Sequence, residues 1–300
     1  IGPVPGVSPQ IKEQSVALLL EAVQKSLDSG AFANARRLAT RALDLSPPDP
    51  GDMRNLLLMR AEAAAERRDL PSARSDAQRA LDSSLRAGDL TDQAIALRLL
   101  GVIAQTEGDI PLARAEIERS IELLRVAGNT TELGTSLSDA GFVEVFGGSL
   151  GKADELLTEA ETLFLELGDR RRRAWAVQHK AWVAFLSGDV SLARQRIEET
   201  LAVFEELGDE AGVSWCLGLM AYLHFMEGDL DRATALAMRV RELSLEDGQS
   251  WAPAMMDTLL SAIRLWSGDF AGSNELSRRA LVTFRETGDR FGIILSLIHI

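Results

Sequence analysis

Apolar residues recur along most of this chain at helical spacing, and breaks containing glycine interrupt them at regular intervals. Within residues 91–126, Leu97 and Ala104 fall on one face of a first helix. Ile117 and Leu124 fall on one face of a second helix, which begins after the break. The pattern therefore predicts pairs of amphipathic helices joined by short connections.

The breaks form two interleaved series, each with a period of 40 residues. Glycine accepts the left-handed conformation that ends a helix, and the Asp, Asn or Ser that follows nearly every one of them caps the next helix. Two breaks per period give two helices per repeat, and a fixed period of this length is typical of a helical solenoid. The first series is Gly88, Gly128, Gly168, Gly208, Gly248 and Gly288, and the second is Gly108, Gly148, Gly188, Gly228 and Gly268.

Small residues also return at fixed positions inside the helices, where they let paired helices approach closely. In the first helices they are Gly101, Gly141, Ala181, Ala221 and Ser261, and in the second helices Ala73, Ala113, Ala153, Ala193, Ala233 and Ser273. Phe164, Phe204 and Phe284 recur at one phase of the second helices, so we interpret them as core residues.

These positions resemble the tetratricopeptide repeat, whose signature is Leu-Gly in helix one and Ala, an apolar residue and Ala in helix two. The matching residues are Leu100 and Gly101 with Ala113, Ile117 and Ser120, and then Ala153, Leu157 and Ala160. The resemblance implies an all-α, right-handed superhelical solenoid of antiparallel hairpins whose first helices line the concave surface. The repeats are longer than the usual unit of about 34 residues.

A second resemblance concerns the parent protein. Two stretches look like the long-period repeats of bacterial signal-transduction regulators of the STAND type, which join a P-loop NTPase to a repeat array and to a helix-turn-helix or cyclase output domain. The stretches read FLELGDRRRRAWAVQHKAWVAFLSGDVSLARQRIEETLAVFEELGD and FRETGDRFG.

We expect three segments along the chain. Residues 1–14 contain a Pro/Gly-rich stretch that predicts a poorly ordered linker, and residues 15–294 form the repeat domain. Residues 295–300, LSLIHI, match the translation of a sequencing adapter, so we expect a truncated or non-native end of a longer protein. The predicted hairpins span residues 15–45, which are out of phase with the rest, then 52–86, 91–126, 131–166, 171–206, 211–246 and 251–286, followed by the start of an eighth.

Aromatic side chains gather on the predicted inward face of the later first helices. Two interpretations stay open, a binding groove for a peptide, protein or small effector, or rings that pack against one another. Phe142, Trp182 and Tyr222 lie one period apart and should form a row along the groove. The candidate groove residues are Phe142, Phe146, Trp175, Gln178, Trp182, Phe185, Trp215, Tyr222, Phe225 and Trp266.

One strongly basic run, Arg170, Arg171, Arg172 and Arg173, lies at a predicted helix N-terminus, where the helix dipole disfavours cations. It predicts either an anion contact or pairing with nearby acids such as Glu206. His179 and His224 have no partner at metal-ligand spacing, so the sequence predicts no metal site. The lone Cys216 lies mid-helix among apolar residues and is interpreted as a small buried side chain.

Composition, charge and the absence of certain motifs limit the classes of function that this chain can have. A net charge of −13 opposes direct binding of nucleic acid, and no apolar run reaches membrane-spanning length. No nucleophile–base pair or carboxylate pair converges on a cleft, so we expect no enzyme and no cofactor. With no targeting segment visible, we expect a cytoplasmic sensor or protein-interaction domain of a larger regulator, whose NTPase and DNA-binding or cyclase domains lie outside these residues. A free-standing scaffold protein is the alternative.

Overall fold

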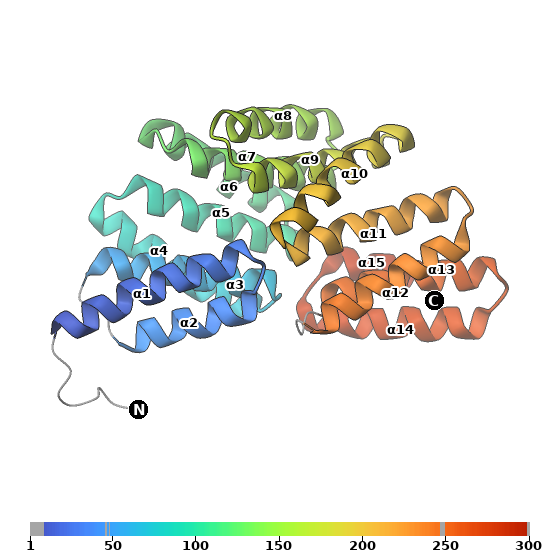
Figure 1. Cartoon of the computed structure of the whole chain (residues 1–300), viewed down its shortest axis with the longest axis horizontal. Helices are drawn as coiled ribbons and strands as arrows, with labels where there is room; N and C mark the ends of the chain where they lie inside the picture. Colours follow the sequence, from blue (N-terminus) through green and yellow to red (C-terminus); the bar gives the residue numbers. More distant parts are fainter. Residues whose placement is uncertain (1–8, 46, 48, 247–249, 299–300) are drawn as a thin grey trace.

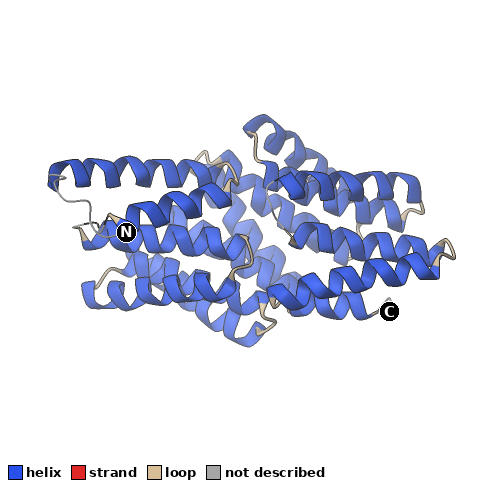
Figure 2. Cartoon of the chain, turned by 90° about the horizontal axis from the view of Figure 1, so that it is seen from below, coloured by secondary structure: helices blue, strands red, loops and turns tan. Residues whose placement is uncertain are grey.

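The computed structural model describes residues 9–45, 47, 49–246 and 250–298, and the regular structure in this part of the chain is entirely helical (Figure 2). Fourteen of the helices form seven consecutive antiparallel hairpins, and α15 begins an eighth. The helices are α1 (Pro9–Asp28), α2 (Phe32–Asp44), α3 (Pro50–Glu66), α4 (Leu70–Ala87), α5 (Leu90–Thr106), α6 (Ile110–Ala127), α7 (Thr130–Phe146), α8 (Leu150–Glu166), α9 (Arg170–Leu186), α10 (Val190–Leu207), α11 (Glu210–Met226), α12 (Leu230–Glu246), α13 (Trp251–Trp266), α14 (Phe270–Thr287) and α15 (Arg290–Leu297).

The predicted helix boundaries follow the glycine series. All its described members have positive φ, as at Gly88 with φ of 70°, while Gly248 lies outside the described residues. The side chain of the following Asp or Asn then accepts a hydrogen bond from the next helix, as Asp89 does from the Asp92 amide at 3.1 Å. Ser149 is the exception among the predicted caps, because its side chain makes no capping bond and instead lies 3.4 Å from Nη2 of Arg114.

The two ends differ in detail from the expectation. Helix α1 begins at Pro9, within the predicted linker 1–14, while residues 1–8 lie outside the described residues. Helix α15 continues to Leu297, into the expected truncated end 295–300, of which residues 299–300 are again outside the described residues. The phase shift of the first hairpin is confirmed, since α2 begins at Phe32 and α4 at Leu70.

Close approach at the small positions holds each hairpin together. A Cβ on Gly141 of α7 would lie only 2.5 Å from Cγ of Leu157 in α8, so a side chain at this position would displace the facing leucine. The equivalent Gly101 of α5 meets Ile117 of α6 in the same way. The phenylalanines at the repeating position, Phe164, Phe204 and Phe284, are 1%, 0% and 0% exposed, which confirms their prediction as core.

The hairpins follow one another around an arch, with the N-terminal hairpins on one side, α8 at its top and the C-terminal hairpins on the other side (Figure 1). Consecutive first helices pack on one another, as α5 does on α3 and α7. The first helices provide most of the lining of the central cavity described below, which agrees with the predicted concave face.

The solenoid curves so strongly that its later helices return to its first ones. A Cβ on Gly30, after α1, would lie 3.3 Å from Cβ of Ala211 in α11. A Cβ on Gly108 would lie 2.8 Å from Cδ of Arg290 in α15. The rings of Phe146 and Phe291 meet edge to face at 5.1 Å. These contacts, which we call the inter-turn contact, join the early repeats to the late ones across the interior of the superhelix.

Close packing at Gly141 makes a prediction about stability. Gly141→Ala should lower the free energy of unfolding by about 1–3 kcal/mol, because the added methyl group overpacks against Leu157 and outweighs the better helix propensity of alanine. Chemical denaturation followed by circular dichroism measures the change. Gly151→Ala is the matched control, because that helical glycine has open space around it and should gain up to about 1 kcal/mol. Equal effects at both positions would contradict the packing account.

Candidate ligand cavity

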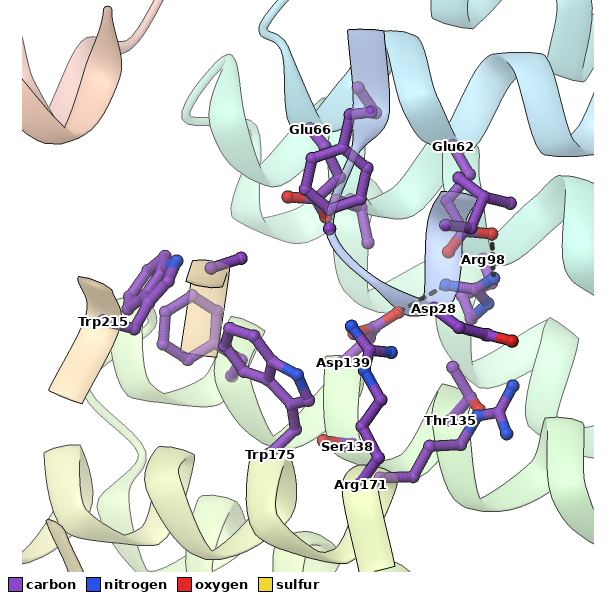
Figure 3. A pocket seen from close by; sticks show the side chains of 18 of the residues that line it. Asp28, Glu62, Glu66, Arg98, Thr135, Ser138, Asp139, Arg171, Trp175 and Trp215 are labelled. Atoms are coloured by element: carbon purple, nitrogen blue, oxygen red, sulfur yellow. Dashed lines mark hydrogen bonds and ion pairs between the residues drawn. The ribbon is translucent and has the colours of Figure 1, made fainter. Parts of the chain in front are cut away.

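The interior of the superhelix is a cavity of about 370 Å³ that extends from α1 to α13. Its lining comes from elements far apart in sequence, and the inter-turn contact brings the first and last of them together. Figure 3 shows Trp175 and Trp215 on one side of the cavity and Glu62 and Arg98 on the other. The cavity therefore has an aromatic wall and a charged wall.

The aromatic wall is a connected set of rings. Phe142 of α7 stacks on His179 of α9, with centroids 4.3 Å apart, and meets the edge of Trp215 at 5.7 Å. Trp215 of α11 in turn stacks on Trp251 of α13 at 5.2 Å. Trp175 completes the set at 6.3 Å from Trp215. Because all these rings also line the cavity, one cluster both packs neighbouring repeats together and presents a surface to a ligand.

The charged wall is built around Arg98 of α5. Its guanidinium donates to Asp139 of α7 at 2.9 Å and lies 3.9 Å from the carboxylate of Glu62 in α3. Burial disfavours the charge of Arg98, but Asp139 and Glu62 outweigh it, so its pKa lies above the ordinary value. Burial raises the pKa of both Glu62 and Asp139, and Arg98 opposes that rise. One cation is thus shared between two carboxylates.

Glu66, one turn further along α3, makes no ion pair or hydrogen bond among the described residues. Its side chain is exposed and borders the cavity. Desolvation there raises the pKa of Glu66 to about 7, with Arg68 opposing the rise and Glu62 adding to it. The cavity therefore holds a carboxyl that is half protonated near neutral pH.

His179 and Cys216 have structural roles in this arrangement. Nδ1 of His179 lies 3.3 Å from Oγ of Ser138, and burial lowers the pKa of His179 to about 3, so the ring is neutral. Cys216 is fully buried and contacts Thr200, and burial raises its pKa to about 12. Among the described residues no cluster of His, Cys, Asp and Glu could hold a metal ion.

Five of the predicted groove residues line a pocket. Phe142, Trp175 and Trp215 line the cavity, whereas Trp182, Tyr222 and again Trp215 line a smaller apolar pocket of about 40 Å³ beside it. The predicted row is therefore interrupted. Trp182 and Tyr222 are neighbours at 6.3 Å, but Phe142 contacts Trp215 instead of continuing the row.

The remaining members of the set lie elsewhere. Gln178 is completely buried, with neither amide atom hydrogen-bonded. Phe146 belongs to the inter-turn contact, and Phe185 packs on Trp182 and Tyr222. Phe225 meets Trp266 at 6.3 Å, and Trp266 is 79% exposed.

Each arginine of the basic run forms an ion pair with an acidic residue. Arg170 makes a bidentate pair with Glu206 at 3.0 and 2.6 Å, the partner anticipated from the sequence. Arg171 pairs with Asp209 at 2.7 Å and Arg172 with Asp169 at 2.6 Å. Arg173 lies 3.3 Å from Glu161. Arg171 and Arg172 reach the cavity lining, but their charges are already compensated, which favours the ion-pair interpretation of this run.

Sequence reasoning did not single out two lining residues, Arg68 and Trp251. Arg68 had a detectable signal, because it occupies the position that glycine holds in the second series, one period before Gly108. Trp251 follows Ser250, whose side chain makes no capping hydrogen bond to α13 among the described residues.

The sequence matches no known family model and no curated protein. Solved structures are similar in fold. The Rap conjugation gene regulator of plasmid pLS20 in complex with the Phr* peptide has a TM-score of 0.73 at 15% identity, over 91% of this chain and 74% of that one. NprR in complex with its cognate peptide NprX has a TM-score of 0.70 at 10% identity, over 95% of this chain and 84% of that one.

A third similar structure is a STAND protein with a tetratricopeptide repeat sensor from Pyrococcus horikoshii, with a TM-score of 0.61 at 15% identity. The match covers 99% of this chain and 44% of that protein. This chain has the tetratricopeptide-repeat fold. The resemblance inferred from the sequence is thereby confirmed at the level of the fold. In the described part of the chain, every helix is too short or too polar to span a bilayer.

The raised pKa of Glu66 predicts a dependence of stability on pH. The protonated form is favoured in the folded state, so stability falls as pH rises from the unfolded value near 4.5 through the folded value of about 7. Glu66→Gln should remove this loss. In denaturant titrations the variant should therefore be more stable than the wild type at pH 8, with a smaller difference at pH 5. Glu242→Gln on exposed α12 is the control, and the same pH trend there would contradict the assignment to Glu66.

Proposed function

We propose that this chain is a non-catalytic ligand-binding repeat domain of a regulatory protein, and that it binds a peptide or an extended protein segment inside its superhelix. The observation that carries the proposal is the cavity, in which an aromatic wall faces a charged wall. Such a surface buries apolar side chains of a peptide while polar groups fix its position. The similarity to two structures described with bound peptides supports this choice of ligand.

The cavity geometry suggests how binding changes the protein. A peptide that touches both the charged wall, on α3, α5 and α7, and the aromatic wall, on α9, α11 and α13, bridges the two sides of the arch. It therefore stabilises the conformation in which the inter-turn contact is made, at the expense of more open ones. Helix α15 carries Arg290 and Phe291 of that contact, so a shift in closure reaches the C-terminal end of the array.

The regulatory context is the second part of the proposal. We infer a cytoplasmic signal-transduction or transcriptional regulator of the STAND type, in which NTPase and DNA-binding or cyclase domains lie outside these residues. The fold similarity to a STAND protein with a repeat sensor supports it. In that setting the domain supplies ligand-dependent closure, and the other domains supply the output.

A scaffold function is favoured by a different surface. Leu186, Met226 and Trp266 follow one another at the repeat period on the C-terminal ends of α9, α11 and α13, and they are 49%, 65% and 79% exposed. An exposed apolar ridge of this kind is typical of a protein-interaction site. Under this alternative, partners bind the outer rim and the cavity stays empty.

Filling the cavity separates the two functions. Thr135 of α7 lines the cavity and is partly buried, so Thr135→Trp should occupy the ligand volume and abolish retention of pentapeptides from a random library. Size-exclusion chromatography followed by mass spectrometry measures the retained peptides. Trp266→Ala, on the exposed rim, should retain them as the wild type does. Retention that survives Thr135→Trp and disappears with Trp266→Ala would contradict cavity binding and support the rim.

A further inference from the structure

Arg68 has a backbone conformation that the other repeats give to glycine. Its φ is 59°, and it is the one non-glycine residue with positive φ in the described part of the chain. At the equivalent position the second glycine series has φ between 76° and 84°. A side chain with a Cβ is strained in the left-handed region, and such strain persists where the surrounding structure or a function requires the side chain. The contacts of the Arg68 side chain show what the strained conformation supports.

The guanidinium of Arg68 lies in the cavity lining and is held on two sides. Nη1 donates a hydrogen bond of 2.7 Å to Oγ1 of Thr106 in α5. The guanidinium carbon lies 4.8 Å from the ring centroid of Trp251 in α13, on the opposite side of the arch. These contacts restrict the orientation of the group and use one of its five N–H bonds.

Arg68 differs from the other cavity arginines in having no carboxylate partner. Arg98, Arg171 and Arg172 each make an ion pair, whereas no described acid lies within ion-pair distance of Arg68. Burial lowers the pKa of Arg68, and the more distant Asp289 and Glu66 offset this only in part. By contrast, Arg98 keeps a raised pKa in the same cavity because its acids are close. Arg68 is thus a partly buried cation in the cavity lining that makes one side-chain hydrogen bond and no ion pair among the described residues.

We propose that Arg68 binds a carboxylate of the ligand, supplied either by the C-terminus of a peptide or by an Asp or Glu side chain. The planar guanidinium can donate two parallel hydrogen bonds to a carboxylate, and the low polarity of the aromatic wall strengthens them. This inference rests on the proposed function and specifies the chemistry of its ligand. It also explains why an arginine occupies this position, although glycine would adopt the positive φ with less strain.

Three pentapeptide libraries test the inference. One lacks Asp and Glu and has a free C-terminus, the second is the same library with amidated C-termini, and the third is amidated but contains Asp and Glu. Binding is measured as retention by the wild-type protein and, for retained peptides, by calorimetry. We expect the first or the third library, or both, to bind at least about tenfold more tightly than the second, since charge-assisted hydrogen bonds are lost with the carboxylate.

The libraries also separate the role of Arg68 from peptide binding in the cavity. Binding of the first library alone identifies a C-terminal carboxylate, and binding of the third alone identifies a side-chain carboxylate. Equal binding of all three libraries would overturn the role of Arg68 while leaving peptide binding in the cavity intact. Retention of no library would overturn both.

Arg68→Gly is the decisive variant because it installs the residue found at this position in the other repeats. It should fold with an unchanged circular dichroism spectrum and lose at least about tenfold in affinity for carboxylate-bearing peptides, with no change for peptides that bind without one. Arg278→Gln, at an exposed position of α14, removes the same charge outside the cavity and should bind like the wild type. Wild-type affinity of Arg68→Gly would overturn the inference.

Discussion

The inter-turn contact is the constraint on which the functional architecture of this protein depends. Without the approach of Ala211 to Gly30 and of Phe291 to Phe146, the first helices would line an open groove exposed to solvent. With it, they line a partly enclosed cavity whose walls come from early and late repeats of the array. The contact consists of a few side chains at the edges of the hairpins, and it is less extensive than the packing between consecutive helices. Closure is therefore the interaction most open to adjustment by a ligand that touches both walls.

Enclosure also determines the electrostatics of the interior. Charges on the concave face of an open solenoid are hydrated, and neighbouring acids and bases perturb them weakly. In the partly enclosed cavity, desolvation raises the pKa of Glu66 and Asp139 and lowers that of Arg68. Where an acid and a base lie close, as Arg98 and Asp139 do, the pair compensates both charges. Glu66 and Arg68 make no ion pair among the described residues, so the charge of Arg68 is available to bind a ligand.

The aromatic residues show how one set of side chains can pack and also form a binding surface. Trp215 contacts Phe142, Trp175, Trp182 and Trp251, and thereby joins α7, α9, α11 and α13. It also lines both the main cavity and the smaller apolar pocket. Packing and binding are thus not exclusive for this residue. Gln178, by contrast, is wholly enclosed and has no face left for a ligand.

The amino-acid sequence by itself determined the local features of this protein. Helix ends, the two helices per repeat and the close approach at Gly141 depend on residues within one or two turns, or within one hairpin, of each other. Such short-range interactions repeat with the period and are visible in the sequence. The tertiary structure alone decided which inward residues share a cavity, because that depends on the accumulated curvature over many repeats. A small change in the rotation per repeat would separate Arg68 from Trp251, although neither their identities nor their places in the repeat would change.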